Sequence, residues 1–379
     1  MGLLFDSDKR NWTAPRPTSM PIYEFLNRSN NPDVLKICAE WEVKFNLMPI
    51  QVKNDVGARF RSQDDREHYS ALLEIFLYSF FQNMNFNIEL HKCGTNKSHA
   101  DFYITKEAGS PCYVEAQCIF GRDYELESQE RRQIYDALRT IKTDKFMLEV
   151  TMSGLPTGTP RIKGLIKSVE TWLNKIDNAV ITKFLVDGNY SSLPTLSLSS
   201  NGIDLKFVPI PLKKHKSRKQ NISVIYSPNA IAIRSDAHER LRDRLQKKAK
   251  RRYGSEQSEI FLVANVFDFF FDEDDIFDAL FGDRVIYFSR KAGSMLTSDE
   301  NLPPRRNNGF WRVLNYKLTN ERISGVVVFD RLDAGNFSTN RPKLIYNPYI
   351  EQEYVFKQFP QFDQFIPDLE NGSFARFEG

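Results

Sequence analysis

The spacing of hydrophobic residues changes from segment to segment along this chain, and each spacing predicts a type of element. Residues 71–81 are apolar almost all round, which is typical of a buried helix. Residues 162–176 carry apolar side chains at helical spacing, whereas 146–152 and 260–266 are short apolar runs typical of buried strands. This alternation of strands and helices predicts an α/β fold in which helices cover the faces of a sheet.

Polar residues predict where some of these helices begin. The two acids at 64–65 are expected to cap the buried helix, because their side chains accept backbone N–H groups at its start. Residues 50–65 show no clear period and are predicted to be irregular. The acids of 272–275 are expected to cap a helix over 276–281, since the ligand spacing and central Gly of a calcium loop are missing.

Two short predicted strands, Asp101–Ile104 and Tyr113–Gln117, carry carboxylates and are joined by a hairpin-like segment. Because side chains alternate across a strand, Glu115 and Gln117 share one face of the second strand. A carboxylate and an amide on a strand of core residues cost free energy unless something binds them. A divalent metal ion would bind both groups.

A third carboxylate, Glu74, is the only charged side chain of the apolar helix that precedes these strands. The order is then a helix with a buried Glu, a strand near 85–91, the Asp101 strand, the Glu115 strand and a further helix. Over residues 65–155 this order resembles the catalytic core of the PD-(D/E)xK nuclease superfamily, the fold of restriction endonucleases. The resemblance implies a restriction-endonuclease-like core, with a central mixed sheet flanked by helices, and a C-terminal α/β extension.

The same resemblance implies a site for phosphodiester hydrolysis. Glu74, Asp101 and Glu115 would bind one or two Mg²⁺ ions (or Mn²⁺), and Mg²⁺ prefers oxygen ligands of this kind. Such an ion would activate water and neutralise the charge that builds on the phosphate. The chain departs from the family at Gln117, which stands where the family has Lys. Gln117 could orient a water molecule by hydrogen bonding, but it supplies no positive charge.

Simpler explanations stay open for each acid. Glu115 would also suit an exposed sheet edge, and Asp101 a turn at the entry to a strand. Glu74 would also suit a buried ion pair with Arg59 or Arg61.

Three other residues near Asp101 could contribute to such a site. Lys92 or Lys97 would be able to place an ammonium group there. His99 would be able to contact the substrate phosphate, although a surface histidine is the commoner explanation for such a residue.

Charge is distributed unevenly along the chain, although the net charge is only +3. Residues 213–252 hold fourteen Lys and Arg against three Asp and Glu, whereas 268–283 hold seven acids and no base. Such asymmetry indicates an anionic partner, although a solvated surface explains it equally well. Few aromatic residues lie among these bases, which favours contact with the backbone of a duplex over stacking with a single strand. The predicted contacts lie on a helix over 237–252 and are Arg244, Lys247, Lys248, Lys250, Arg251 and Arg252.

A length of 379 residues suggests one to three domains. We predict an N-terminal arm and helix over 1–60, the nuclease-like core over 61–180 and the extension with its basic helix over 181–379. No run of 18 apolar residues predicts a membrane span, and the first residues turn polar too soon for a signal peptide, so a cytoplasmic protein is expected. Four cysteines without a C-x-x-C motif argue against a zinc site.

The prediction from sequence is therefore a Mg²⁺-dependent endonuclease that acts on double-stranded DNA, in the setting of prokaryotic genome or anti-phage defence. Cleavage of both strands would suit a homodimer, and a partner protein could activate the chain. The alternative is a catalytically inactive module of the same fold, lacking the family's Lys, that binds nucleic acid or a partner protein.

Overall fold

The computed structural model divides the chain into two compact units, the second of which is inserted into the first. Unit 1 comprises residues 1–13, 22–124 and 235–379, and unit 2 comprises 14–21 and 125–234. The residues that the structure describes are 4–91, 99–106, 111–121, 129–212, 220–222, 224–226, 236–251, 259–268, 271–285, 305–314, 317–349, 362–368 and 373–377.

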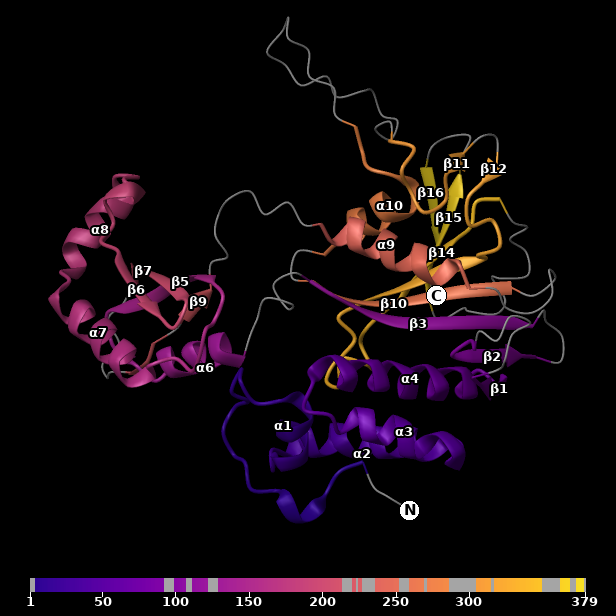
Figure 1. The fold of residues 1–379 in the computed structure, drawn as a ribbon, viewed down its shortest axis with the longest axis horizontal. Helices are drawn as coiled ribbons and strands as arrows, with labels where there is room; N and C mark the ends of the chain where they lie inside the picture. The colour runs from indigo at the N-terminus through magenta and orange to yellow at the C-terminus, as the bar shows by residue number, and fades with distance from the viewer. Residues whose placement is uncertain are drawn as a thin grey trace, which may run out of the picture. The chain divides into compact units, whose positions relative to one another are not determined.

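A mixed sheet of eight described strands forms the centre of unit 1, in the order β1-β2-β3-β10-β13-β14-β15-β16 (Figure 1). β2 runs antiparallel to both of its neighbours, whereas β3, β10 and β13 run parallel to one another. β14 is antiparallel to β13, β15 is parallel to β14, and β16 is antiparallel to β15. The bounds are β1 (Asn87–Leu90), β2 (Phe102–Thr105), β3 (Cys112–Phe120), β10 (Glu259–Phe267), β13 (Gly325–Asp330), β14 (Lys343–Tyr346), β15 (Asp363–Asp368) and β16 (Ser373–Phe377).

Helices cover both faces of this sheet, so the predicted α/β class with a central mixed sheet is confirmed (Figure 1). On one face α4 packs against the strands, and three shorter helices pack against α4. On the other face α9 packs against β3 and β10, and α10 packs against α9. The bounds are α1 (Ile22–Arg28), α2 (Pro32–Leu47), α3 (Ile50–Phe60), α4 (Asp65–Asn83), α9 (Ala237–Ala249) and α10 (Glu273–Phe281).

α3 lies where residues 50–65 were predicted to be irregular, so that prediction is wrong. Its buried residues, Lys53, Val56, Gly57 and Phe60, fall at the spacing of one helix face. Two of these four are a lysine and a glycine, so the hydrophobic pattern of the segment hides its period.

The predicted caps of α4 and α10 are confirmed. The Asp64 side chain accepts the N–H of Arg66 at the start of α4. Asp272 and Asp275 form a reciprocal capping box at the start of α10.

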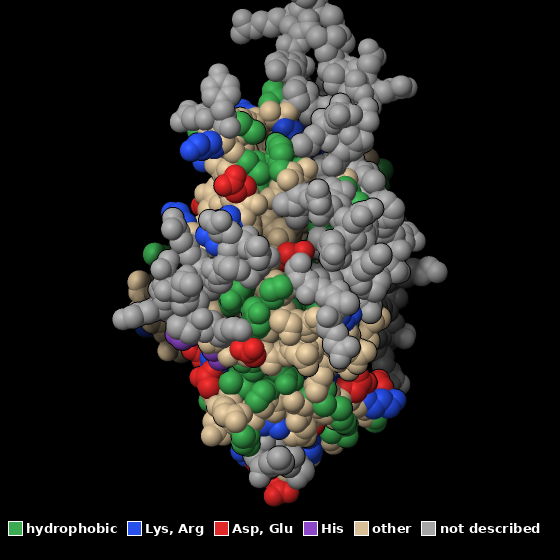
Figure 2. All heavy atoms as spheres, turned by 90° about the vertical axis from the view of Figure 1, so that its right-hand side faces the viewer, with side chains coloured by type: hydrophobic (Ala, Val, Ile, Leu, Met, Phe, Trp, Pro, Cys, Tyr) green, Lys and Arg blue, Asp and Glu red, His purple; other side chains and the backbone are tan. Residues whose placement is uncertain are grey.

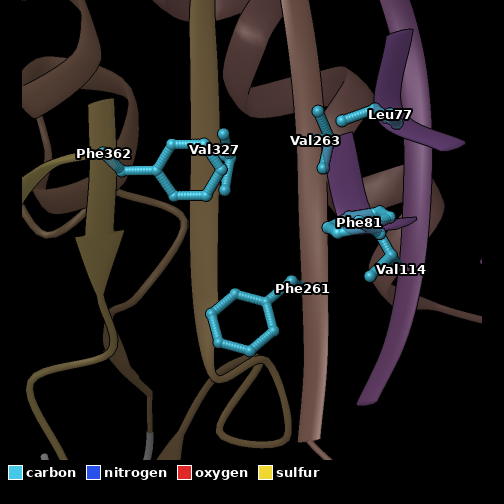
Figure 3. Close-up of a pocket in the computed structure, with 7 residues that line it drawn as sticks. All are labelled: Leu77, Phe81, Val114, Phe261, Val263, Val327 and Phe362. Carbon is cyan, nitrogen blue, oxygen red and sulfur yellow. The ribbon is translucent and has the colours of Figure 1, made fainter. Parts of the chain in front are cut away.

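The core between α4 and the sheet is apolar and closely packed. A small cavity of about 10 Å³ lies there, lined only by hydrophobic side chains (Figure 3). Leu77 and Phe81 reach it from α4, and Val114 and Val263 reach it from the sheet. A space of this size holds about one water molecule, so it is no site for a substrate.

Unit 2 has its own sheet and its own hydrophobic core. The sheet has the order β6-β7-β5-β9, and α7 and α8 contact its strands. Asp136 of α6 accepts the backbone N–H groups of Thr18 and Ser19, which ties residues 14–21 to this unit. The bounds are α6 (Gln129–Leu138), β4 (Lys142–Thr143), β5 (Phe146–Gly154), α7 (Ile162–Lys175), α8 (Asn178–Val186), β6 (Leu196–Ser200), β7 (Ile203–Pro211), β8 (Gln220–Asn221) and β9 (Val224–Tyr226).

The two units differ from the domain boundaries predicted from sequence. The predicted core at 61–180 joins a part of unit 1 to a part of unit 2, because the longer segment of unit 2 begins at residue 125, shortly after β3. The predicted extension at 181–379 contains β10 and β13, which in fact continue the central sheet beside β3.

No helix among the described residues has the length and apolar character needed to cross a membrane.

Candidate functional site

Glu115 lies near the middle of the central sheet, on the face that α9 covers. The neighbouring residue Val114 belongs to the core on the α4 side, whereas Tyr113 belongs to the core on the α9 side. Alternation along β3 therefore turns Glu115 and Gln117 toward α9, as the sequence predicts. Glu115 is only 1% exposed, so the simpler explanation of an exposed edge acid does not hold.

Two basic side chains from the C-terminal end of α9 meet the buried carboxylate of Glu115. Lys248 Nζ lies 2.5 Å from Glu115 Oε2, and Arg251 Nη1 lies 3.1 Å from the same oxygen. Lys248 also donates to the backbone carbonyl of Ala116 at 3.3 Å. A buried carboxylate is tolerated only where cations and hydrogen bonds offset its lost hydration, and these contacts provide both.

Asp101 reaches the same point from the residue before β2. Its Oδ2 lies 3.6 Å from Lys248 Nζ, and the same oxygen accepts the backbone N–H of Ala116 at 2.7 Å. This hydrogen bond across the antiparallel β2–β3 pair fixes the Asp101 carboxylate beside Glu115. Lys248 therefore contacts the carboxylates of both predicted strand acids.

Gln117 lies two residues beyond Glu115 on the same face of β3. It is half-buried, and its Nε2 is buried without a hydrogen-bond partner among the described residues. A buried amide that lacks a partner costs about 1–3 kcal/mol, so such a group is expected to bind a water molecule or a ligand.

The third predicted acid, Glu74, does not join this group. Both of its carboxylate oxygens accept hydrogen bonds from Arg59 of α3, at 2.8 Å and 2.7 Å. The hydrogen bond to Glu74 also raises the pKa of Arg59 above its usual value. The alternative of an ion pair between Glu74 and Arg59 is therefore confirmed, although both side chains are only partly buried.

The sheet separates Glu74 from the other two acids. Glu74 interacts electrostatically with Cys118, which packs against the core on the α4 side, whereas Glu115 faces α9. Burial on that side raises the pKa of the Cys118 thiol to about 12. Among the described residues no three His, Cys, Asp or Glu side chains gather as a metal site. The structure thus brings Asp101 and Glu115 together, with Gln117 near them, and leaves Glu74 apart.

The basic residues predicted to contact nucleic acid divide into two sets. Arg244, Lys247 and Lys250 are exposed, whereas Lys248 and Arg251 point to Glu115. Arg252 lies outside the described residues. On the face drawn in Figure 2, described acidic and basic side chains are scattered among hydrophobic ones.

The other basic residues considered near Asp101 contribute little that the structure describes. His99 is exposed, and its Nδ1 lies 3.0 Å from the backbone carbonyl of His91. Lys92 and Lys97 lie outside the described residues.

A buried charged cluster at the opposite end of α9 fixes this helix against α10. His238 is 5% exposed, and its ring nitrogens lie 3.5 Å from Asp275 and 3.5 Å from Asp283. Arg242 pairs with Asp283 at 2.6 Å. Hydrogen bonding to Asp275 and the charge of Asp283 raise the pKa of His238, although burial opposes them. The cluster therefore helps to hold the helix that presents Lys248.

Asp101 and Glu115 are the residues of this site whose carboxylate oxygens could hold a magnesium ion. Carboxylate oxygens from two strands converge on Lys248 Nζ, so this point already accommodates a positive charge. Mg²⁺ in phosphate-processing sites is commonly held by one or two carboxylates together with water and phosphate oxygens.

In comparisons with known proteins, no family model, no curated protein and no solved structure matches the chain.

Proposed function

We propose that this protein is a metal-dependent nuclease that hydrolyses phosphodiester bonds of DNA at Asp101, Glu115, Gln117 and Lys248. The observation that carries the proposal is the position of Lys248, whose ammonium lies 2.5 Å from Glu115 and 3.6 Å from Asp101. The resemblance to the PD-(D/E)xK superfamily requires two strand carboxylates and a lysine. This sequence has Gln117 where the family has that lysine. Lys248 of α9 places an ammonium group beside the same two carboxylates.

The order of elements in unit 1 supports the same proposal. α4, β1, β2 and β3 follow one another as the resemblance requires, with Asp101 before β2 and Glu115 within β3. The next described helix of unit 1 is α9, which is followed by the parallel strand β10. Unit 2 is inserted between β3 and α9, so a restriction-endonuclease-like core would span unit 1 rather than residues 61–180.

Each residue of the site has a distinct role in the proposed reaction. Asp101 and Glu115 would hold Mg²⁺ or Mn²⁺, which activates the attacking water and neutralises charge on the phosphate. Lys248 provides positive charge where the phosphate and the attacking oxygen become more negative. The amide of Gln117, which has no hydrogen-bond partner in the part of the chain that the structure describes, would orient the attacking water. Glu74 has no catalytic role in this account, because it is bound to Arg59.

The exposed bases of α9 would bind the phosphate backbone of a duplex. Arg244, Lys247 and Lys250 are exposed on the helix that also supplies Lys248. Binding by a few such contacts depends strongly on salt and little on sequence. We further propose that the protein acts in prokaryotic genome defence, with a second copy or an activating partner completing double-strand cleavage.

The experiment that tests the proposal is plasmid cleavage with Mg²⁺ or Mn²⁺. Wild type is expected to cleave, and Asp101→Ala, Glu115→Ala and Lys248→Ala are each expected to lose about a hundredfold or more in rate. Lys36→Ala is the matched control, because Lys36 lies on a helix of the same unit with its side chain 76% exposed.

An intact plasmid with a salt-sensitive mobility shift would contradict the proposal. That result would favour the inactive nucleic-acid-binding module, in which Lys248 and Arg251 neutralise Glu115 permanently. Cleavage that survives Lys248→Ala unchanged would refute the role assigned to this lysine.

A further inference from the structure

Two cations share a single carboxylate oxygen in the proposed site, and they differ in exposure. Lys248 and Arg251 both contact Glu115 Oε2, whose side chain has no exposed area. The side chain of Lys248 is 17% exposed, whereas that of Arg251 is 47% exposed. The two positive charges are therefore not equivalent.

The charged side chains that the structure describes in this site balance one another without a metal ion. Asp101 and Glu115 contribute two negative charges, and Lys248 and Arg251 contribute two positive ones. A divalent cation on the two carboxylates would place excess positive charge in a buried region, where like charges repel strongly.

Arg251 is the cation that can leave at the lower cost. Lys248 is held by Asp101, Glu115 and the carbonyl of Ala116, and little of its side chain reaches solvent. Arg251 follows the end of α9 and keeps about half of its side chain in solvent. Solvent can therefore hydrate the released guanidinium of Arg251 more readily than the ammonium of Lys248.

We propose that Arg251 is a displaceable clamp that couples metal binding to substrate binding. It neutralises Glu115 in the metal-free protein, and it turns to the substrate phosphate when a divalent cation takes the carboxylate. A guanidinium suits this second role because it binds phosphate through two parallel hydrogen bonds. The inference rests on the proposed function, and it adds that metal and nucleic acid bind cooperatively, each favouring the other by the same factor.

The first test measures Mn²⁺ binding by calorimetry in the absence of nucleic acid. Arg251→Gln removes the competing charge and is expected to bind Mn²⁺ about fivefold more tightly than wild type. Arg251→Lys keeps the charge and is expected to stay within about twofold of wild type.

Arg331→Gln is the matched control for this measurement. Arg331 pairs with Asp330 at 3.0 Å and is 45% exposed, close to the values for Arg251. Its substitution changes the net charge equally but is expected to leave Mn²⁺ affinity unchanged. Thermal melting of each variant checks that unit 1 is folded.

The second test measures binding of a short phosphorothioate duplex, which resists hydrolysis, with and without Mn²⁺. Mn²⁺ is expected to tighten duplex binding by wild type about fivefold or more, and to give Arg251→Gln no comparable gain. Equal Mn²⁺ affinities in wild type and Arg251→Gln, or equal gains in duplex affinity, would overturn the clamp. If wild type still cleaves plasmid, either of these results refutes the role of Arg251 but not the proposed nuclease activity. If no variant binds Mn²⁺ and wild type does not cleave plasmid, both proposals are refuted.

Discussion

Substitution of Lys248 by Met tests whether the buried acid depends on this lysine for the stability of the fold. Methionine keeps much of the length of the side chain but removes the ammonium group that lies 2.5 Å from Glu115. Among the described residues, Arg251 at 3.1 Å would then be the cation left beside Glu115, while the carboxylate stays inside the protein.

The magnitude follows from the partners that remain. Removal of one member of a buried ion pair usually costs about 3–5 kcal/mol, because it leaves an uncompensated charge. Arg251 still compensates part of that charge here, so we expect a loss of about 2 kcal/mol in the free energy of unfolding. Glu115→Gln in the same chain removes the stranded charge, so the double variant should recover at least about half of the loss.

Urea unfolding of unit 1, followed by the fluorescence of its buried Trp41, measures these changes. Lys36→Met is the control, since Lys36 forms an exposed pair with Asp33 at 3.7 Å and should change stability by less than about 0.5 kcal/mol. A Lys248→Met variant as stable as this control would refute the dependence of Glu115 on Lys248. A Glu115→Gln substitution that increases the loss of stability, instead of reducing it, would also refute that dependence.

Three further outcomes are expected. Glu74→Gln should lower the free energy of unfolding by about 1–3 kcal/mol, because it weakens the pair with Arg59. The same substitution should leave the Mn²⁺ affinity measured by calorimetry unchanged, and a weaker affinity would show that Glu74 binds the metal. His238 has a raised pKa in the folded protein, so its stabilising contribution is complete below its unfolded pKa of about 6.5 and is lost as pH rises through the folded value. Melting temperatures should accordingly show wild type exceeding His238→Gln most at low pH, and a constant difference would contradict this. Neutralising the three exposed bases of α9 together should reduce the slope of log K for duplex binding against log salt by about 2.7, and an unchanged slope would place the duplex elsewhere.

The sequence predicts the part of the site that depends on strand geometry. Alternation along β3 correctly placed Glu115 and Gln117 on one face, and the hairpin-like connection correctly paired the Asp101 strand with β3. These relations involve residues that are close together in the chain, so the two-residue alternation of side chains along a strand determines them.

The local sequence pattern does not predict which face of the sheet Glu74 lies on. α4 is apolar almost all round, so its sequence does not tell which of its sides meets the sheet or which face of the sheet it covers. Arg59 is one of the two partners that the sequence offers for Glu74, but its segment shows no helical period because α3 buries a lysine and a glycine.

Lys248 was missed as a member of the site because it is 133 residues from Glu115 in the chain. The basic helix suggested only contacts with nucleic acid, although its narrow apolar stripe of Leu241 and Leu245 already indicated which side faces the sheet. Lys248 lies three residues after Leu245, on that same side of the helix. The insertion of unit 2 between β3 and α9 hid the relation, because sequence patterns do not reveal that a domain interrupts a sheet.

Anomalous scattering of Mn²⁺, in crystals of the protein grown with that ion, would locate the metal directly. We expect one Mn²⁺ held by carboxylate oxygens of Asp101 and Glu115, at about 2.2 Å, with Arg251 no longer on Glu115. Crystals that hold no Mn²⁺ at this point, with Lys248 and Arg251 still on the carboxylate, would contradict it.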